Sequence, residues 1–149
     1  SRALPPVHLL RRVFDEARTY TDAKGMLCET TLAIPAFFTL AGIEDGEGCV
    51  IERGEQLAHV QGAPASIANH WIAGDGTGHP RGGDSEGRWR MMEELRDRAP
   101  GDFSWVQPPI LNPTTRLAIV ANAARGTLSV QGFEAPGGKV GPATAVFRL

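Results

Sequence analysis

A short segment near the middle of the chain carries the residue types best suited to chemistry. Asn69 follows an apolar run and precedes His70 and Trp71, and Arg88 lies in the first turn of a predicted helix. An amide at the end of a strand can donate a hydrogen bond to an oxyanion, and a guanidinium can point back at the same pocket. By spacing alone, however, a turn asparagine and an exposed helix arginine remain the favoured interpretation.

The histidines and glycines show no metal or cofactor motif. Four histidines lie far apart in the sequence, with no HxxxH or HxH pair: His8, His59, His70 and His79. We therefore expect no metal site. The glycine-rich stretch 73–83 imitates part of a phosphate-binding loop, but it neither follows the first strand of a βαβ unit nor ends in Lys-Ser/Thr, so we expect no cofactor.

The two cysteines lack the surroundings of a nucleophile, whereas the residue counts leave a Ser-His-Asp triad open. Cys28 lies at the end of a predicted helix and Cys49 inside a predicted strand. Neither has a helix start or a flanking cation nearby to lower its pKa, which indicates buried structural thiols. No GxSxG turn is present.

The elements that must position these residues follow from apolar periodicity, caps and turn signals. Helices are predicted over residues 5–18, from Thr21 as the cap to about 28, and from Asp84 or Ser85 to about 98. Strands are predicted over residues 36–43, 49–53, 56–60, 66–71, 116–123, 127–133 and 143–149, with hairpin turns at 45–46 and 124–126 and a loop over 73–83. Helices and strands in separate runs predict an α+β fold with packed helices and a mainly antiparallel sheet.

The composition excludes several classes of partner. The 149 residues carry 15 Lys+Arg against 17 Asp+Glu, a net charge of -2, with no run of basic residues. Nucleic acids and anionic membranes bind clustered positive charge, so neither is an expected partner. No apolar stretch reaches the roughly 18 residues that cross a bilayer, and the start does not resemble a signal peptide. We expect a soluble, cytoplasmic chain of one domain, with long loops.

Five motifs follow one another in the order found in a known enzyme family. They occupy residues 6–12, 36–42, 46–53, 68–71 and 84–88. The most specific are Gly-Glu-Gly-Cys-Val-Ile-Glu-Arg at 46–53 and Asn-His-Trp at 69–71. In this order they resemble the C-terminal part of the acid ceramidase and N-acylethanolamine acid amidase family, which is related to choloylglycine hydrolases and penicillin acyltransferases. All of these are N-terminal-nucleophile hydrolases of linear amides.

The resemblance implies a fold and a mechanism. The chain is then expected to form part of a four-layer αββα sandwich. In the family, a cysteine released by self-cleavage attacks the amide carbonyl, and its own α-amine acts as the base. Asn69 resembles the asparagine of the oxyanion hole. Arg88 resembles the arginine that lines the pocket, with Arg81 and Arg90 as competing matches.

The family's nucleophile is missing from the matched region. That cysteine, with an Arg and an Asp soon after it, lies upstream in the family, and Cys28 and Cys49 match helix and sheet interior instead. Ser1 has an α-amine that can act as a base, but a helix follows it almost at once, where a nucleophile needs to open a strand. We therefore expect a C-terminal segment of a larger hydrolase, inactive alone.

Two functions remain open at this point. In the first, the segment completes an amide hydrolase together with the N-terminal part of the same enzyme or with further copies. Asn69 and Arg88 then serve catalysis, and His70 and Trp71 contact a small N-acyl amide substrate. In the second, the chain is an autonomous α+β domain that binds a small ligand or self-associates through an uncovered sheet face.

Overall fold

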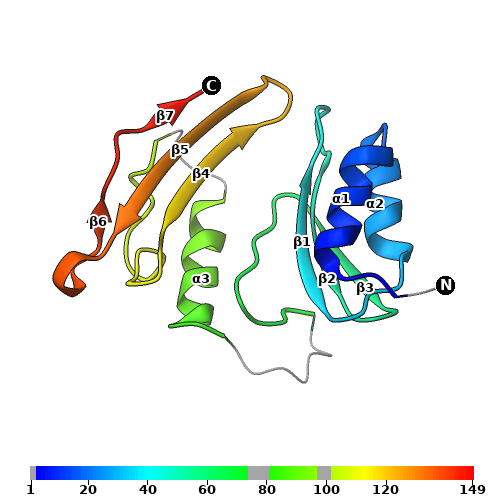
Figure 1. The fold of residues 1–149 in the computed structure, drawn as a ribbon, viewed down its shortest axis with the longest axis horizontal. Coiled ribbons are helices and arrows are strands. Elements are labelled where there is room, and N and C mark those ends of the chain that lie inside the picture. Colours follow the sequence, from blue (N-terminus) through cyan, green and yellow to red (C-terminus); the bar gives the residue numbers. More distant parts are fainter. Residues whose placement is uncertain (1–2, 74–80, 97–101) are drawn as a thin grey trace. The chain divides into compact units, whose positions relative to one another are not determined.

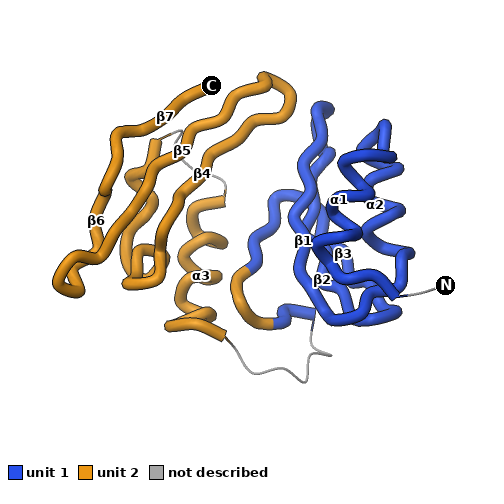
Figure 2. Tube along the Cα trace, viewed as in Figure 1, with its two compact units in different colours: residues 1–67, 71–77 blue, residues 68–70, 78–149 orange. Residues whose placement is uncertain are grey.

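The computed structural model describes residues 3–73, 81–96 and 102–149, and these fall into two compact units (Figures 1 and 2). Unit 1 comprises residues 1–67 and 71–77, and unit 2 comprises residues 68–70 and 78–149. The chain passes from unit 1 to unit 2 before Ala68 and returns to unit 1 between His70 and Trp71, so the Asn-His-Trp motif is divided between the two units.

Unit 1 packs two helices on one face of a three-stranded antiparallel sheet (Figure 1). Its elements, in chain order, are α1 (Pro6–Glu16), α2 (Tyr20–Glu29), β1 (Ala36–Ala41), β2 (Gly48–Arg53) and β3 (Ala58–Gly62), and the strand order is β1-β2-β3. Its core consists of Leu9, Val13, Ala23, Leu27, Leu32, Phe38, Cys49 and Ile51. In this core, the apolar side chains of α1 lie on one side of the helix and face alternate residues of the strands. This arrangement follows from the side-chain periodicity of a helix and of a strand.

The cap of helix α2 lies two residues before the predicted one. The residue that caps the helix is Thr19, whose Oγ1 accepts a hydrogen bond from the Asp22 N–H at 3.0 Å, so the prediction of Thr21 was wrong. Both threonines have the required hydroxyl, but Thr19 has the extended backbone of a cap and Thr21 is already helical. Asp22 also places a negative charge in the first turn, where the helix dipole favours it.

The predicted hairpin between β1 and β2 is confirmed. Phe38 pairs with Ile51 in an antiparallel register, and Gly46 in the connection has a φ of 81°, which favours glycine. Glu47 tightens this connection, because its carboxylate accepts hydrogen bonds from the backbone N–H groups of Ile43 and Glu44.

Unit 2 contains one helix and a second antiparallel sheet. Its elements are α3 (Ser85–Leu95), β4 (Leu117–Asn122), β5 (Thr127–Glu134), a 3-10 turn (Pro136–Gly138), β6 (Gly141–Pro142) and β7 (Phe147–Arg148). Strand β5 pairs with β4 on one side and with β6 and β7 on the other. The buried core is small and consists of Val106, Ala118 and Phe133. The predicted hairpin at 124–126 is confirmed, with Gly126 at a φ of 62°.

Several predicted boundaries were wrong. The third strand covers Ala58–Gly62, two residues later than expected, and the final strand shortens to Phe147–Arg148. The predicted strand over 66–71 does not form, because nearby amides bond to side chains: Asn69 N–H donates to Ser85 Oγ, and Ile72 N–H donates to Glu52. Parts of the predicted loop (74–80) and of the predicted end of α3 (97–98) lie outside the described residues.

The α+β class is confirmed, with three helices and two antiparallel sheets in the described part of the chain. Among the same residues, no helix combines the length and apolar character needed to cross a membrane.

Candidate functional site

Helix α3 brings Arg88 into contact with Asn69. The Arg88 Nη2 donates a hydrogen bond to Asn69 Oδ1 at 2.9 Å, and the same nitrogen lies 3.4 Å from the Arg81 carbonyl oxygen. The helix starts where Asp84 caps it, accepting from the Gly87 N–H at 3.0 Å. Arg88 is one turn beyond this cap, so the start of the helix fixes its position.

The backbone of Asn69 is fixed on both sides. Its N–H donates to Ser85 Oγ at 2.8 Å, and its carbonyl accepts from the Arg81 N–H at 2.9 Å. Asn69 is therefore held by its backbone and by its side chain, although the residue is exposed. An exposed side chain that is nevertheless fixed is suited to binding.

The competing arginines do not take the place of Arg88. Arg81 contributes the backbone contacts just described, and Arg90 pairs with Glu86 at 3.4 Å on the exposed side of α3. Gly82 makes the Arg88 position possible: it has a φ of 77°, and a Cβ there would lie 3.2 Å from Arg88 Nη2. The segment before α3 thus lies close to the guanidinium, in a backbone conformation that favours glycine.

His70 belongs to the same cluster in unit 2. Its Nδ1 lies 2.8 Å from Ser85 Oγ, and its ring meets that of Trp89 edge-on, with centroids 6.0 Å apart and an interplanar angle of 89°. Ser85 is only 3% exposed. The Trp89 Nε1 is buried and has no hydrogen-bond partner among the described residues.

Trp71 lies in unit 1, because the chain returns to that unit between His70 and Trp71. Its ring packs edge-on against Phe37 of β1, with centroids 4.8 Å apart. The next two residues are bound by Glu52, whose carboxylate accepts from the N–H groups of Ile72 at 2.9 Å and Ala73 at 3.1 Å. The structure therefore brings Asn69, Arg88 and His70 together, whereas Trp71 is packed into the sheet of unit 1.

Sequence reasoning missed Ser85 and Glu52. Ser85 was considered only as a possible helix cap, and because Asp84 caps α3, the Ser85 hydroxyl can bind the 69–70 segment instead. Glu52 could have been found, since it and Arg53 are consecutive charges in an otherwise apolar strand. Both are buried, with exposed fractions of 3% and 0%. Buried charges are rare unless a specific contact stabilises them.

The two cysteines differ in burial, although the sequence indicated that both are buried. Cys49 is buried and Cys28 is half-buried, and burial raises the pKa of the Cys28 thiol. Burial, with Cys49 as a neighbour, also raises the pKa of Tyr20 to about 12. A raised pKa keeps a thiol protonated, which is the reverse of what a nucleophile needs.

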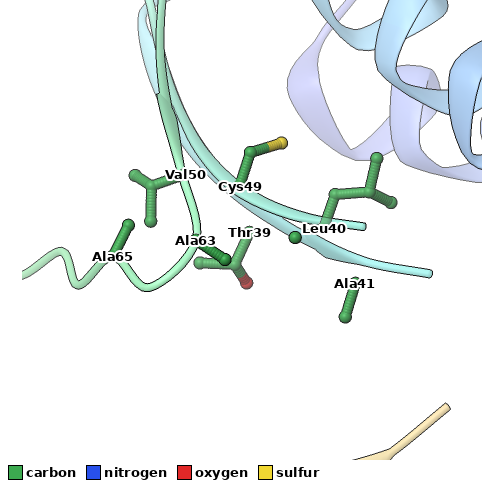
Figure 3. A pocket seen from close by; sticks show the side chains of 8 residues that line it. Thr39, Leu40, Ala41, Cys49, Val50, Ala63 and Ala65 are labelled. Carbon is green, nitrogen blue, oxygen red and sulfur yellow. The ribbon is translucent and has the colours of Figure 1, made fainter. Parts of the chain in front are cut away.

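The face of the unit 1 sheet opposite the helices carries a small apolar pocket of about 340 Å³ (Figure 3). The side chains of Thr39, Val50, Ala63 and Ala65 line it, whereas Cys49 points to the other face of the sheet (Figure 3). No three His, Cys, Asp or Glu side chains of the described ranges come together in a way that could hold a metal ion.

Comparison with known proteins relates part of the chain to one enzyme. Over 45 residues, 30% of the chain, it is 47% identical to acid ceramidase of Heterocephalus glaber and 44% identical to acid ceramidase of Homo sapiens. This part of the chain is similar to acid ceramidases. It covers 11% of the length of each of these two relatives. No known family profile matches it.

This relationship supports the family resemblance that the sequence motifs indicated. Acid ceramidase of Rattus norvegicus is 42% identical over the same length of 45 residues. The matched segments account for 30% of the chain. The roles of Asn69, Arg88, His70 and Trp71, and the position of this chain within a longer enzyme, therefore remain predictions.

Proposed function

We propose that the chain is the C-terminal segment of an N-terminal-nucleophile hydrolase that cleaves linear N-acyl amide bonds. The relationship to acid ceramidases supports the enzyme class. The observation that carries the proposal is the hydrogen bond of 2.9 Å from Arg88 Nη2 to Asn69 Oδ1, because it determines what Asn69 can offer a substrate.

That hydrogen bond orients the amide of Asn69. A guanidinium has only donors, so the amide group facing Arg88 must be the oxygen. The Nδ2 group, with its two N–H donors, is then turned away from Arg88. A neutral donor held in place before the reaction stabilises the oxyanion that forms when a nucleophile attacks an amide carbonyl.

The other residues take supporting roles in this proposal. Arg88 fixes Asn69 and adds positive potential near the developing oxyanion. His70, in the same cluster as Asn69 and Arg88, contacts the N-acyl amide substrate. The nucleophilic cysteine and its α-amine come from the N-terminal part of the same enzyme, because Cys28 and Cys49 are half-buried and buried, respectively, in unit 1.

The test is the Asn69→Ala substitution in the full-length enzyme, assayed with a fluorogenic N-acyl amide. We expect kcat to fall by about 10² or more, the usual effect of removing one oxyanion donor. Asn122→Ala is the matched control, because Asn122 also accepts one hydrogen bond, from the Arg125 N–H in the β4–β5 turn. Its kcat should stay unchanged, and the 149-residue chain alone should not turn over substrate. An unchanged kcat in Asn69→Ala would contradict the proposal.

A second candidate is an autonomous α+β domain that self-associates, and one observation favours it. One face of the unit 2 sheet is apolar and exposed, with Ile119 at 53% and Phe147 at 57%. Both lie in register with Val130 of β5, so they share that face. Exposed apolar patches of this kind often mark interaction sites.

A further inference from the structure

We propose that Ser85 is a positioning residue that fixes the backbone of Asn69 and also sets the tautomer of His70, so that His70 presents its Nε2–H as a second neutral donor next to Asn69. The catalytic consequence rests on the proposed function. The part of the proposal that concerns the hydrogen bonds to Asn69 and His70 rests only on the contacts of Ser85.

The argument starts from the groups around one buried hydroxyl. Ser85 Oγ lies 2.8 Å from the Asn69 nitrogen and 2.8 Å from His70 Nδ1. A backbone N–H can only donate, so the oxygen accepts from Asn69. The hydroxyl has one proton to donate, and His70 Nδ1 is the acceptor in contact with it. Because Ser85 is only 3% exposed, water offers little alternative, and a buried hydroxyl without an acceptor is destabilising.

The hydroxyl proton therefore determines the state of the imidazole. When Nδ1 accepts a hydrogen bond it carries no proton, and a neutral imidazole then carries its proton on Nε2. The edge-on contact with Trp89 further limits rotation of the ring. His70 is left with Nε2–H as a donor, which suits an acceptor oxygen of the substrate, such as a carbonyl or hydroxyl oxygen, rather than a protonated amine.

Ser85 is available for this role because it does not cap its helix. The carboxylate of Asp84 accepts the N–H of Gly87 at 3.0 Å, which is the capping contact of α3. Ser85 is the first residue of α3, and Arg88 lies one turn later on the same helix. The start of one helix thus fixes Asn69 through its backbone, by Ser85, and through its side chain, by Arg88.

The direct test is the tautomer of His70, read from the nitrogen chemical shifts of the full-length protein labelled with 15N-histidine and assigned with His70→Gln. We expect an unprotonated Nδ1 and a protonated Nε2 in the unsubstituted protein. Ser85→Ala should produce a mixture of both tautomers, and Ser85→Thr, which keeps a hydroxyl, should restore the single one. The control is Ser104→Ala, whose hydroxyl bonds to exposed Asp102.

A protonated Nδ1 in the unsubstituted protein, or a Ser85→Ala spectrum identical to it, would overturn the proposal. These readings do not need activity, so they stand whether or not Asn69 proves to be an oxyanion donor.

Kinetics test the catalytic consequence. Ser85→Ala should lower kcat about tenfold or more, because small displacements of positioned groups have effects of this size. Ser85→Thr should recover most of it. In an Asn69→Ala background, Ser85→Ala should lose the part of its effect on kcat that acts through Asn69, since residues that act through one another are not additive. Full additivity of the two substitutions would overturn the role of Ser85 in positioning Asn69.

Discussion

Glu52 shows how a single buried side chain can hold a loop. The residue is 3% exposed, and its carboxylate binds the N–H groups of Ile72 and Ala73, which follow directly after the Asn-His-Trp motif. Phe37 lies opposite Glu52 in the β1–β2 register and packs against Trp71. One polar and one aromatic contact therefore attach residues 71–73 to the sheet of unit 1.

Removing this carboxylate should destabilise the protein strongly. Glu52→Ala leaves two backbone N–H groups without their acceptor, and we expect a loss of about 2–4 kcal/mol in the free energy of unfolding. Urea denaturation followed by circular dichroism measures it. Exposed Glu55→Ala is the matched control and should change stability by less than about 0.5 kcal/mol. Equal effects of the two substitutions would show that the Glu52 contacts contribute nothing.

At the scale of elements, Arg53 joins three parts of unit 1. Its guanidinium is fully buried and donates to the carbonyl oxygens of Leu27 and Thr30 at the end of α2, and to that of Leu57 just before β3. The last carbonyls of a helix have no partner within the helix, so an arginine from a neighbouring strand satisfies them. Helix α2 is thus attached to the sheet by polar contacts as well as by Leu27.

Arg53→Lys tests whether the branched guanidinium, rather than the charge, is required. An ammonium cannot reach all three carbonyls in the same geometry. We therefore expect the free energy of unfolding to fall by about 2 kcal/mol or more. Exposed Arg11→Lys, which keeps a surface pair with Asp15, is the control and should be nearly neutral. Differential scanning calorimetry gives both values. A neutral Arg53→Lys would mean that charge alone is sufficient.

At the scale of the whole molecule, the two units differ in how much apolar surface they bury. The unit 1 core has eight buried residues among those the structure describes, whereas the unit 2 core has three, and unit 2 keeps an apolar sheet face exposed. Strand β4 pairs only with β5 among the described residues, and it contains no charged residue. Uncharged edge strands favour association.

Light scattering of the 149-residue chain tests this surface. If the exposed face of unit 2 drives self-association, Ile119→Lys should lower the apparent mass, because it places a charge among apolar neighbours. Val7→Lys on α1 is the control, since Val7 is also exposed, at 66%, but lies in unit 1. A monomeric chain before any substitution would contradict self-association and leave the enzyme segment as the better interpretation.

Local patterns predicted the parts of the fold that depend on local physics. The apolar spacing of Leu9 and Val13 identified α1, and the glycines at 46 and 126 identified both hairpins. The sequence also paired Asn69 with Arg88, a contact across 19 positions, but only through the order of the motifs. Their spacing alone favoured a turn asparagine and an exposed helix arginine that share no site.

The errors arose where distant side chains replace backbone pairing. The segment 66–71 has the apolar composition of a strand, yet Ser85 and Glu52 take the amide hydrogens nearby. Nothing near residue 69 in the sequence indicates an acceptor 16 positions later. Likewise, Asp84 and Ser85 are equally good caps by residue type, and only the folded helix shows which one is used.

Gly82 has a consequence for how this protein can diverge in evolution. It has no functional group, yet its φ is 77°, a conformation that residues with a side chain rarely adopt, and the position that a Cβ would occupy is 3.2 Å from Arg88 Nη2, a tight contact. A larger residue would therefore strain the backbone and require the guanidinium to shift by a few tenths of an ångström. Descendants of this sequence that keep the Asn69–Arg88 contact should therefore keep a glycine here, so that an absent side chain becomes as informative a marker of the site as the arginine itself.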